Sequence, residues 1–170
     1  MAAEPRAVQA PPPWLDSERL ALAAIILASH HQGFGRPLLA GLNGDAHNSA
    51  APTSQAQELF AAATVVMAHG GGDDPKLIYA NRAALQLWRR PWSEQVGLPS
   101  RLTAEPQERA GRAALLSRAL DQQAIGGYQG IRIDSQGRRF VIRNARLWTL
   151  WTPGGEPCGQ AAAFSDWWWL

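Results

Sequence analysis

Apolar residues first recur regularly after a proline-rich start, between Asp16 and about His31. Asp16 or Ser17 can cap a helix here, because a short polar side chain accepts a hydrogen bond from the first helical turn. The apolar residues fall on more than one side of this helix. We therefore expect the rest of the domain or a partner subunit to cover it.

A denser series of short patterns begins at Ser54. Ser54 and Gln57 have the spacing of a capping box, and Asn81 precedes an apolar stretch that it can cap. In the last third, alternating apolar residues between Gly-containing turns predict three antiparallel strands. In order, the predicted elements are a short helix at 54–60, strands at 64–67 and 76–80, helices at 82–90, 93–96 and 103–123, and strands at 128–134, 139–151 and 158–166.

This order of two strands, several helices and three strands predicts an α+β fold. We expect a five-stranded antiparallel sheet with helices packed on one face, plus the N-terminal helix. The expected organisation is a disordered tail at 1–13, a helix and connector at 14–40, a loop at 41–53, the sheet domain at 54–166 and a Trp-rich C-terminal end at 167–170.

Length and cysteine content exclude several classes of protein. The chain has 170 residues, 46% of them hydrophobic, which suits one domain better than two. Its single cysteine, Cys158, excludes an internal disulfide and the paired cysteines of zinc fingers, iron–sulfur proteins and c-type haem carriers. A lone cysteine is ordinary in a reducing compartment, so we expect a cytoplasmic protein.

The basic residues concentrate in the middle of the chain. Residues 82–146 hold twelve arginines against five acidic residues, although the net charge of the whole chain is only +2. Guanidinium groups suit a bound anion or a phosphate backbone. Since the chain has no run of five basic residues, nucleic acid is the least favoured partner.

A membrane location is not expected. The longest strongly apolar run, Leu20–Ala28, has nine residues, whereas a spanning helix needs about 20. Acidic residues in the first eighteen positions also argue against a secretory signal.

Six ordered segments resemble the MEKHLA domain, a PAS-like family found in small bacterial proteins and in certain plant homeodomain leucine-zipper transcription factors. The segments are Tyr79–Leu85, Gly97–Leu102 with Ala104–Pro106, Tyr128–Ile133, Gly137–Phe140, Leu147–Leu150 and Gly159–Ala162. The resemblance is firm over residues 81–164 and looser from Asp16 to Leu39. It implies a PAS-like fold and a sensory or ligand-binding role, and it implies no particular chemistry.

The resemblance also limits the cofactor. PAS domains commonly use the space between sheet and helices as a cofactor pocket. Haem-binding members supply a histidine from the helical region, whereas all four histidines here precede it, so His-ligated haem or metal is not expected. Light-sensing members have a cysteine on the helix after the second strand, whereas Cys158 lies at a later turn. The cofactor or ligand, if the protein binds one, is therefore expected to be a non-covalently bound flavin or a small metabolite.

Candidate ligand-binding residues are polar and aromatic side chains on the expected strands and on the helical region above them. They are Trp92, Arg101, Tyr128, Arg132, Asn144, Trp148 and Gln160. By resemblance to flavin-binding PAS domains, Gln160 is the nearest analogue of a glutamine that contacts the flavin ring. The alternatives are that the tryptophans only pack in the core and that Arg101 forms an ion pair with Glu105.

Catalysis is not expected. The sequence lacks a nucleophile elbow, a zinc-binding His-Glu-x-x-His helix and a phosphate-binding Gly-Lys-Ser/Thr loop. Gly70–Gly72 lacks the lysine and the helix that a phosphate loop requires, so it is expected to form a turn.

Two functions remain. In the first, a stand-alone PAS-like sensory module binds a small anionic or aromatic molecule between sheet and helices, alters the docking of the N-terminal helix and signals to a partner. In the second, no ligand binds, and the helix at 17–31 together with Trp167–Trp169 mediates homodimerisation or docking to another protein.

Overall fold

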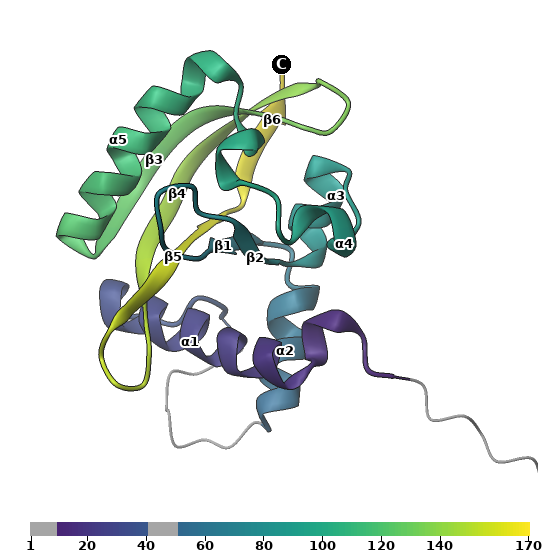
Figure 1. The fold of residues 1–170 in the computed structure, drawn as a ribbon, viewed down its shortest axis with the longest axis vertical. Helices are drawn as coiled ribbons and strands as arrows, with labels where there is room; N and C mark the ends of the chain where they lie inside the picture. The colour runs from purple at the N-terminus through teal and green to yellow at the C-terminus, as the bar shows by residue number, and fades with distance from the viewer. Residues whose placement is uncertain (1–9, 41–50) are drawn as a thin grey trace, which may run out of the picture.

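The computed structural model describes residues 10–40 and 51–170 (Figure 1). A six-stranded antiparallel sheet is the centre of this part of the chain. Its strands lie in the order β2-β1-β5-β4-β3, and β6 pairs with the first half of β4. They are β1 (Val65–His69), β2 (Leu77–Ala80), β3 (Ala124–Ile133), β4 (Arg139–Trp151), β5 (Pro157–Phe164) and β6 (Asp166–Trp169).

The sixth strand is a difference from the sheet expected from the sequence. After Phe164 the chain continues as β6, in which Trp169 pairs with Phe140 of β4. The rings of Trp167 and Trp169 lie 6.1 and 5.6 Å from the Phe140 ring, so the Trp-rich end belongs to the sheet. Because alternate residues of a strand face opposite sides, Trp168 points the other way and is 41% exposed.

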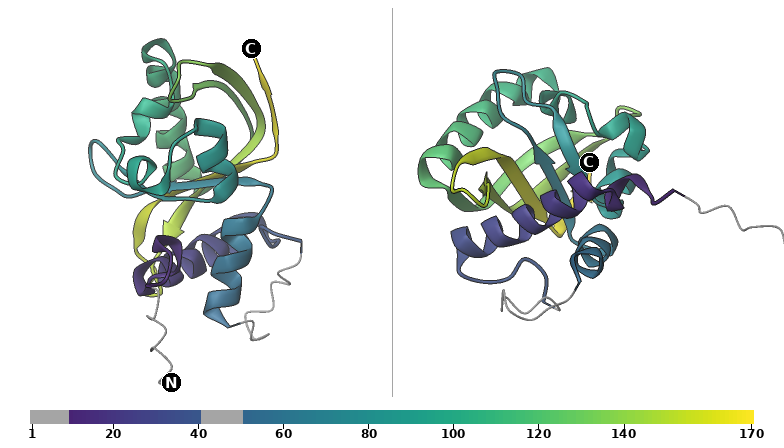
Figure 2. Two further views of the ribbon diagram at one scale, coloured as in Figure 1. Left: turned by 90° about the vertical axis from the view of Figure 1, so that its right-hand side faces the viewer. Right: turned by 60° about the horizontal axis from the view of Figure 1, so that its bottom comes forward.

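Helices lie on both sides of the sheet (Figure 2). The N-terminal helices α1 (Ser17–Phe34) and α2 (Pro52–Ala61) pack on one face, where Ile26 and Leu59 join a core with Val66, Trp148 and Leu150. The short helix η1 (Pro13–Leu15) precedes α1. The other face is bordered by α3 (Arg82–Trp88), η2 (Ser100–Thr103) and α5 (Pro106–Gln122), and α4 (Trp92–Gln95) lies next to β2. The second core, around Trp88 and Phe140, lies on this side.

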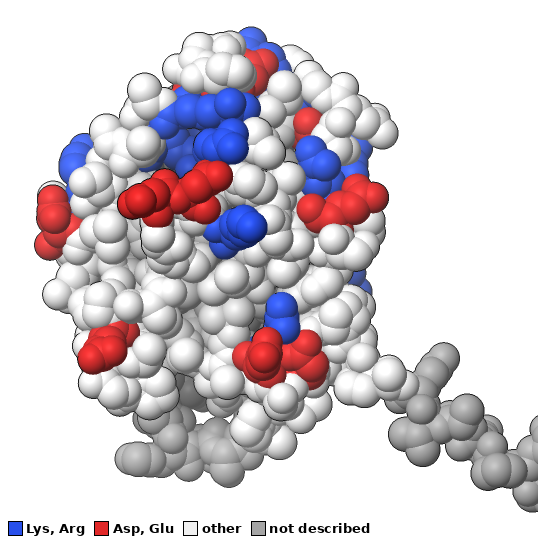
Figure 3. Space-filling model, viewed as in Figure 1, with Lys and Arg blue, Asp and Glu red and all other residues white. Residues whose placement is uncertain are grey.

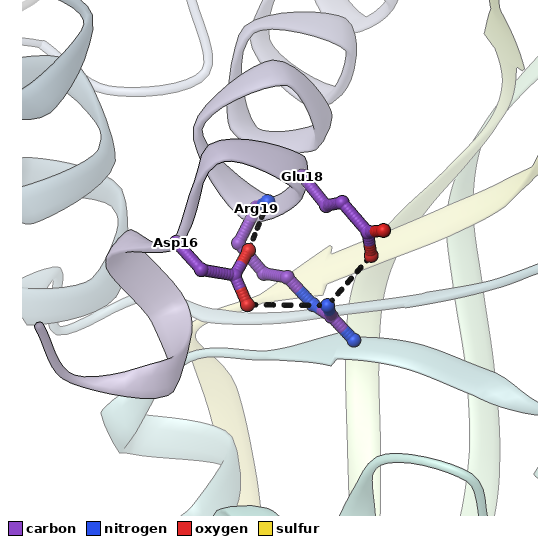
Figure 4. Close-up of polar contacts among 3 residues, drawn as sticks. All are labelled: Asp16, Glu18 and Arg19. Atoms are coloured by element: carbon purple, nitrogen blue, oxygen red, sulfur yellow. Dashed lines mark hydrogen bonds and ion pairs between the residues drawn. The ribbon is translucent and has the colours of Figure 1, made fainter. Parts of the chain in front are cut away.

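The start of α1 follows the expected capping. The Asp16 carboxylate accepts a hydrogen bond of 2.8 Å from the backbone N–H of Arg19, and the Arg19 guanidinium bridges Asp16 and Glu18 (Figure 4). The two carboxylates also lie at the positive end of the helix dipole. The helix is apolar on several sides, as the sequence indicates, and the sheet and α2 of the same chain pack against it.

Asn81 joins three elements. Its side-chain oxygen accepts from the backbone N–H groups of Val66 and Ala84, at 3.0 and 3.1 Å, so it caps α3 and also bonds to β1. Its amide nitrogen donates to three carbonyl oxygens, the shortest contact being 2.7 Å to Thr64. This fully buried side chain fixes α3 against the sheet and the end of α2.

Some element boundaries differ from the expected ones. The capping box at Ser54 is wrong, because α2 begins at Pro52 with Ala51 as its N-cap. β3 begins at Ala124 and includes Gly126 and Gly127, four residues earlier than the strand expected at 128–134, since α5 ends at Gln122 and Gln123 turns the chain with φ 64°. Most of the expected tail and loop, residues 1–9 and 41–50, lies outside the described residues.

Candidate functional site

A cavity of about 50 Å³ lies between the sheet and the helices η2 and α5. Most of its lining is apolar and comes from β1, β4, β5 and α5, as in Leu115, Leu116, Ile142, Leu147 and Ala162. The polar side chains in the lining are His69, Thr103, Arg112, Tyr128, Arg132 and Gln160. An apolar enclosure with a few converging polar groups is the usual form of a small-molecule site.

β3 supplies one cationic wall of this cavity. Tyr128, Gly130 and Arg132 are at alternate positions and so share a face of the strand. The Arg132 guanidinium donates to the Tyr128 hydroxyl at 3.0 Å and lies over the Tyr128 ring, 5.4 Å from its centroid. A methyl group at Gly130 would overlap the Tyr128 hydroxyl, so the glycine permits this arrangement.

Arg112 of α5 brings a second guanidinium to the same cavity. Burial, and then the charge of Arg132, lower the pKa of Arg112 from 12.5 to about 10, so Arg112 remains cationic at neutral pH. The six ion pairs among the described residues involve neither of them. The cavity therefore holds two like charges without a carboxylate from the described part of the chain.

His69, at the end of β1, is the third ionisable group. Its Nδ1 lies 2.7 Å from the carbonyl oxygen of Gly70. Because a carbonyl can only accept, Nδ1 carries the proton. Nε2 is buried and has no hydrogen-bond partner among the described residues. Burial and, more weakly, the charge of Arg112 lower the pKa of His69, although the bond to Gly70 opposes them.

Gln160 connects the sheet to α5. Its amide nitrogen donates to the Leu116 carbonyl oxygen at 2.9 Å. His69, Leu116 and Gln160 also border a surface groove of about 400 Å³, which runs past Gly70–Gly72 and Pro157–Gly159. These three side chains thus separate the cavity from the groove.

The structure brings three of the seven expected site residues to the cavity, namely Tyr128, Arg132 and Gln160. Trp92 lies instead near the N-terminal helices, with its ring 5.7 Å from that of Tyr79 and 6.3 Å from that of Phe60. Arg101 lies on the surface in an ion pair of 3.1 Å with Asp74. The alternative pairing with Glu105 is wrong, because that carboxylate contacts Arg139.

Asn144 and Trp148 also lie away from the cavity, and a bulge in β4 is the reason. Ile142 pairs with Gly130 and Ala145 with Tyr128, so β4 holds one extra residue between these pairs, and Asn144 adopts φ 54°. The bulge reverses which positions face the cavity. Asn144 is consequently exposed, and Trp148 faces α1, where its Nε1 donates to the Ile26 carbonyl oxygen at 3.3 Å.

Sequence reasoning missed His69 and Arg112. A signal existed for Arg112, because it shares one side of its helix with Leu115, Leu116 and Ala119, at i, i+3, i+4 and i+7. An arginine on the only apolar side of an otherwise polar helix points toward the core. His69 follows Met67 by two positions on β1 and therefore lies on the same face.

The cavity is too small for a flavin with these side chains in place. Ligand pockets usually enclose about 300–1,000 Å³, whereas this one has about 50 Å³. A flavin ring system would therefore need side chains of the lining to move. Cys158 lies outside the cavity lining, and burial raises the pKa of its thiol.

Solved structures with similar folds are PAS and light-oxygen-voltage domains. A PAS domain of a protein from Colwellia psychrerythraea has a TM-score of 0.59 at 12% identity, covering 66% of this chain and 93% of that chain. A light-oxygen-voltage domain studied with a flavin analogue has a TM-score of 0.55 at 15% identity, covering 69% and 84%. The light-state dimer of the fungal blue-light photoreceptor Vivid has a TM-score of 0.50 at 14% identity, covering 61% and 78%.

At these low identities, the structural similarity establishes the PAS-like fold and nothing of the ligand.

Among the helices that the structure describes, none combines the length and the apolar character that a membrane span requires. A search of curated proteins gives no match. The family model of the MEKHLA domain matches residues 20–169, from α1 to the last strand. The chain therefore belongs to the MEKHLA domain family.

Proposed function

We propose that this protein is a non-catalytic sensory module that binds a small anion in the cavity between the sheet and α5. The observation that carries the proposal is the pair of guanidinium groups, Arg112 and Arg132, which face one cavity without a carboxylate among the described residues.

The energetics favour an anion as the missing partner. A buried charge is costly unless it is paired, and a second like charge beside it adds to the cost. An anion between the two arginines would remove both penalties and form charge-assisted hydrogen bonds. The planar fork of a guanidinium suits a carboxylate or a phosphate particularly well.

The size of the cavity restricts this anion. About 50 Å³ has room for roughly three or four water molecules by volume. Acetate and other carboxylates of a few non-hydrogen atoms are of this size. This comparison favours a small metabolite over a flavin.

Figure 3 shows how charged side chains are distributed on one face of the molecule. Most of the Lys and Arg atoms on this face lie in its upper half, and Asp and Glu atoms lie beside them there. The positive charge on which the proposal depends is therefore that of Arg112 and Arg132 in the cavity lining.

We propose that α5 transmits the bound state to a partner protein. Of its residues only Ala119 is fully buried, and the Gln160–Leu116 hydrogen bond links it to β5. A helix with so few buried side chains shifts at little cost when the cavity fills. The N-terminal helix, α1, is further from such a change because it packs on the opposite face of the sheet.

The proposal is tested by measuring anion-induced stabilisation of the purified, dialysed protein. Acetate, phosphate and sulfate are added at matched ionic strength, and the melting temperature is recorded for wild type, Arg132→Met and Arg101→Met. We expect at least one anion to stabilise the wild type and the surface control Arg101→Met but not Arg132→Met. Equal responses of all three proteins, or none in the wild type, would reject the site. Mass spectrometry of the native protein detects a ligand that co-purifies.

A second candidate function is dimerisation through β6. Trp168 and Leu170 are 41% and 58% exposed, and β6 pairs on one side with β4. Exposed aromatic residues next to a strand edge favour association with another chain. Sedimentation of wild type and Trp168→Ser at several concentrations tests this idea. A wild-type protein that stays monomeric throughout rejects it.

A further inference from the structure

His69 adds a requirement to the anion site. Its Nδ1–H donates to the Gly70 carbonyl oxygen, so in the neutral ring Nε2 carries no proton and can accept a hydrogen bond. The residue is only 8% exposed, and Nε2 has no partner among the described residues. A buried acceptor without a donor is unfavourable, and a ligand that donates a hydrogen bond would satisfy it.

The charges of the neighbouring side chains determine which hydrogen-bond donor group a ligand can place beside His69. His69, Arg112 and Arg132 line the same cavity. A ligand ammonium group would enter the field of two guanidinium groups, which repel it. A hydroxyl group donates a hydrogen bond without bringing a positive charge.

We infer that the cavity selects small hydroxycarboxylates, with the carboxylate at Arg112 and Arg132 and the hydroxyl donating to His69 Nε2. This inference rests on the proposed anion site and specifies its ligand class. A cavity of about 50 Å³ restricts the compound to a short chain, so the hydroxyl lies on the carbon next to the carboxylate. Glycolate and lactate are the simplest members of this class.

The test compares ligands that differ by one hydroxyl. Titration calorimetry of the full-length protein at pH 7 uses glycolate against acetate and lactate against propionate. We expect each hydroxy acid to bind about ten-fold more tightly than its partner, the effect of one hydrogen bond to a buried acceptor. His69→Leu should abolish this preference and retain acetate binding. The control His31→Leu, at an exposed histidine of α1 away from the cavity, should retain the preference.

The outcomes separate this inference from the proposed function. If glycolate and acetate bind equally and Arg132→Met weakens both, the hydroxyl selection is wrong and the anion site stands. If no carboxylate binds, both are wrong. Should His69→Leu fail to fold, the wild-type imidazole nitrogens still decide the matter by NMR. We expect the apo protein to carry its proton on Nδ1 and glycolate to shift the Nε2 signal, and a proton on Nε2 in the apo protein would overturn the inference.

Discussion

Replacing Arg112 with methionine should stabilise the ligand-free protein. Most substitutions are destabilising and Arg112 is partly buried, so an increase in stability is a sharp test of the anion site. Methionine keeps an unbranched stem against Leu115 and Leu116 but removes the charge. The cavity then holds a single guanidinium group, that of Arg132.

The magnitude follows from the pKa of Arg112. Its decrease from 12.5 to about 10 corresponds to roughly 3 kcal/mol of unfavourable free energy for the charged form in the folded protein. Partial contact with solvent and the lost contacts of the guanidinium reduce the gain. We expect an increase of about 1–2 kcal/mol in the free energy of unfolding, which raises the melting temperature of a domain of this size by about 2–8 °C.

Urea unfolding of dialysed protein at pH 7 measures this change. The matched control is Arg101→Met, because Arg101 is half-exposed and paired with Asp74. Loss of such a surface pair costs about 0–1 kcal/mol. In saturating acetate the order should reverse, since only a protein with Arg112 gains binding energy. A loss of more than about 1 kcal/mol for Arg112→Met without ligand would mark the arginine as structural and contradict the reasoning.

Three further predictions concern the framework around the cavity. Asn81→Ala should lower the free energy of unfolding by about 3–5 kcal/mol, because it leaves two buried N–H groups without an acceptor. Urea unfolding measures this change, and a loss below about 1 kcal/mol would refute the role of Asn81 in joining the three elements. Trp148→Ala should cost about 3–5 kcal/mol and leave anion affinity unchanged in calorimetry, since Trp148 packs on α1; altered affinity would argue against the assignment of faces. Burial, and then the charge of Arg146, lower the pKa of His30 from 6.5 to about 4. The contribution of neutral His30 to the free energy of unfolding is therefore fully present above pH 6.5. It should fall by up to about 3 kcal/mol as the pH drops toward 4, because the unfolded chain then binds a proton that the folded protein excludes. His30→Gln should remove most of this decline and exposed His31→Gln should keep it, and an unchanged decline in His30→Gln would exclude His30 as its cause.

The fold was predictable where local signals are strong. Asn81 caps its helix as the sequence indicates, and the turns of the last third define three antiparallel strands. The extra strand was not predictable from local patterns. Trp167–Trp169 become β6 because Phe140 lies opposite them in the folded sheet, and this contact joins residues far apart in the sequence.

The site was predictable only in part, because strand positions were assigned without the bulge. Tyr128 and Arg132 lie on β3, opposite the bulge, where no extra residue interrupts the alternation, and they were placed correctly on one face of that strand. Beyond Asn144 each assignment in β4 is reversed, which moves Trp148 to the opposite side of the sheet. A single residue with positive φ therefore determines which side chains surround the cavity.

The spacing Tyr128-x-Gly130-x-Arg132 explains how the sequence keeps a costly charge in place. The ring of Tyr128 folds across Gly130 and holds the Arg132 guanidinium by its hydroxyl and its π face. These contacts orient Arg132 but do not neutralise it, and Arg112 adds a second charge instead of an acidic partner. A core selected for stability alone would have an apolar residue or a carboxylate at one of these positions. Where a protein violates the local rules of stability, the position is commonly a functional one, and this supports the proposal that the two arginines bind an anion from outside the chain.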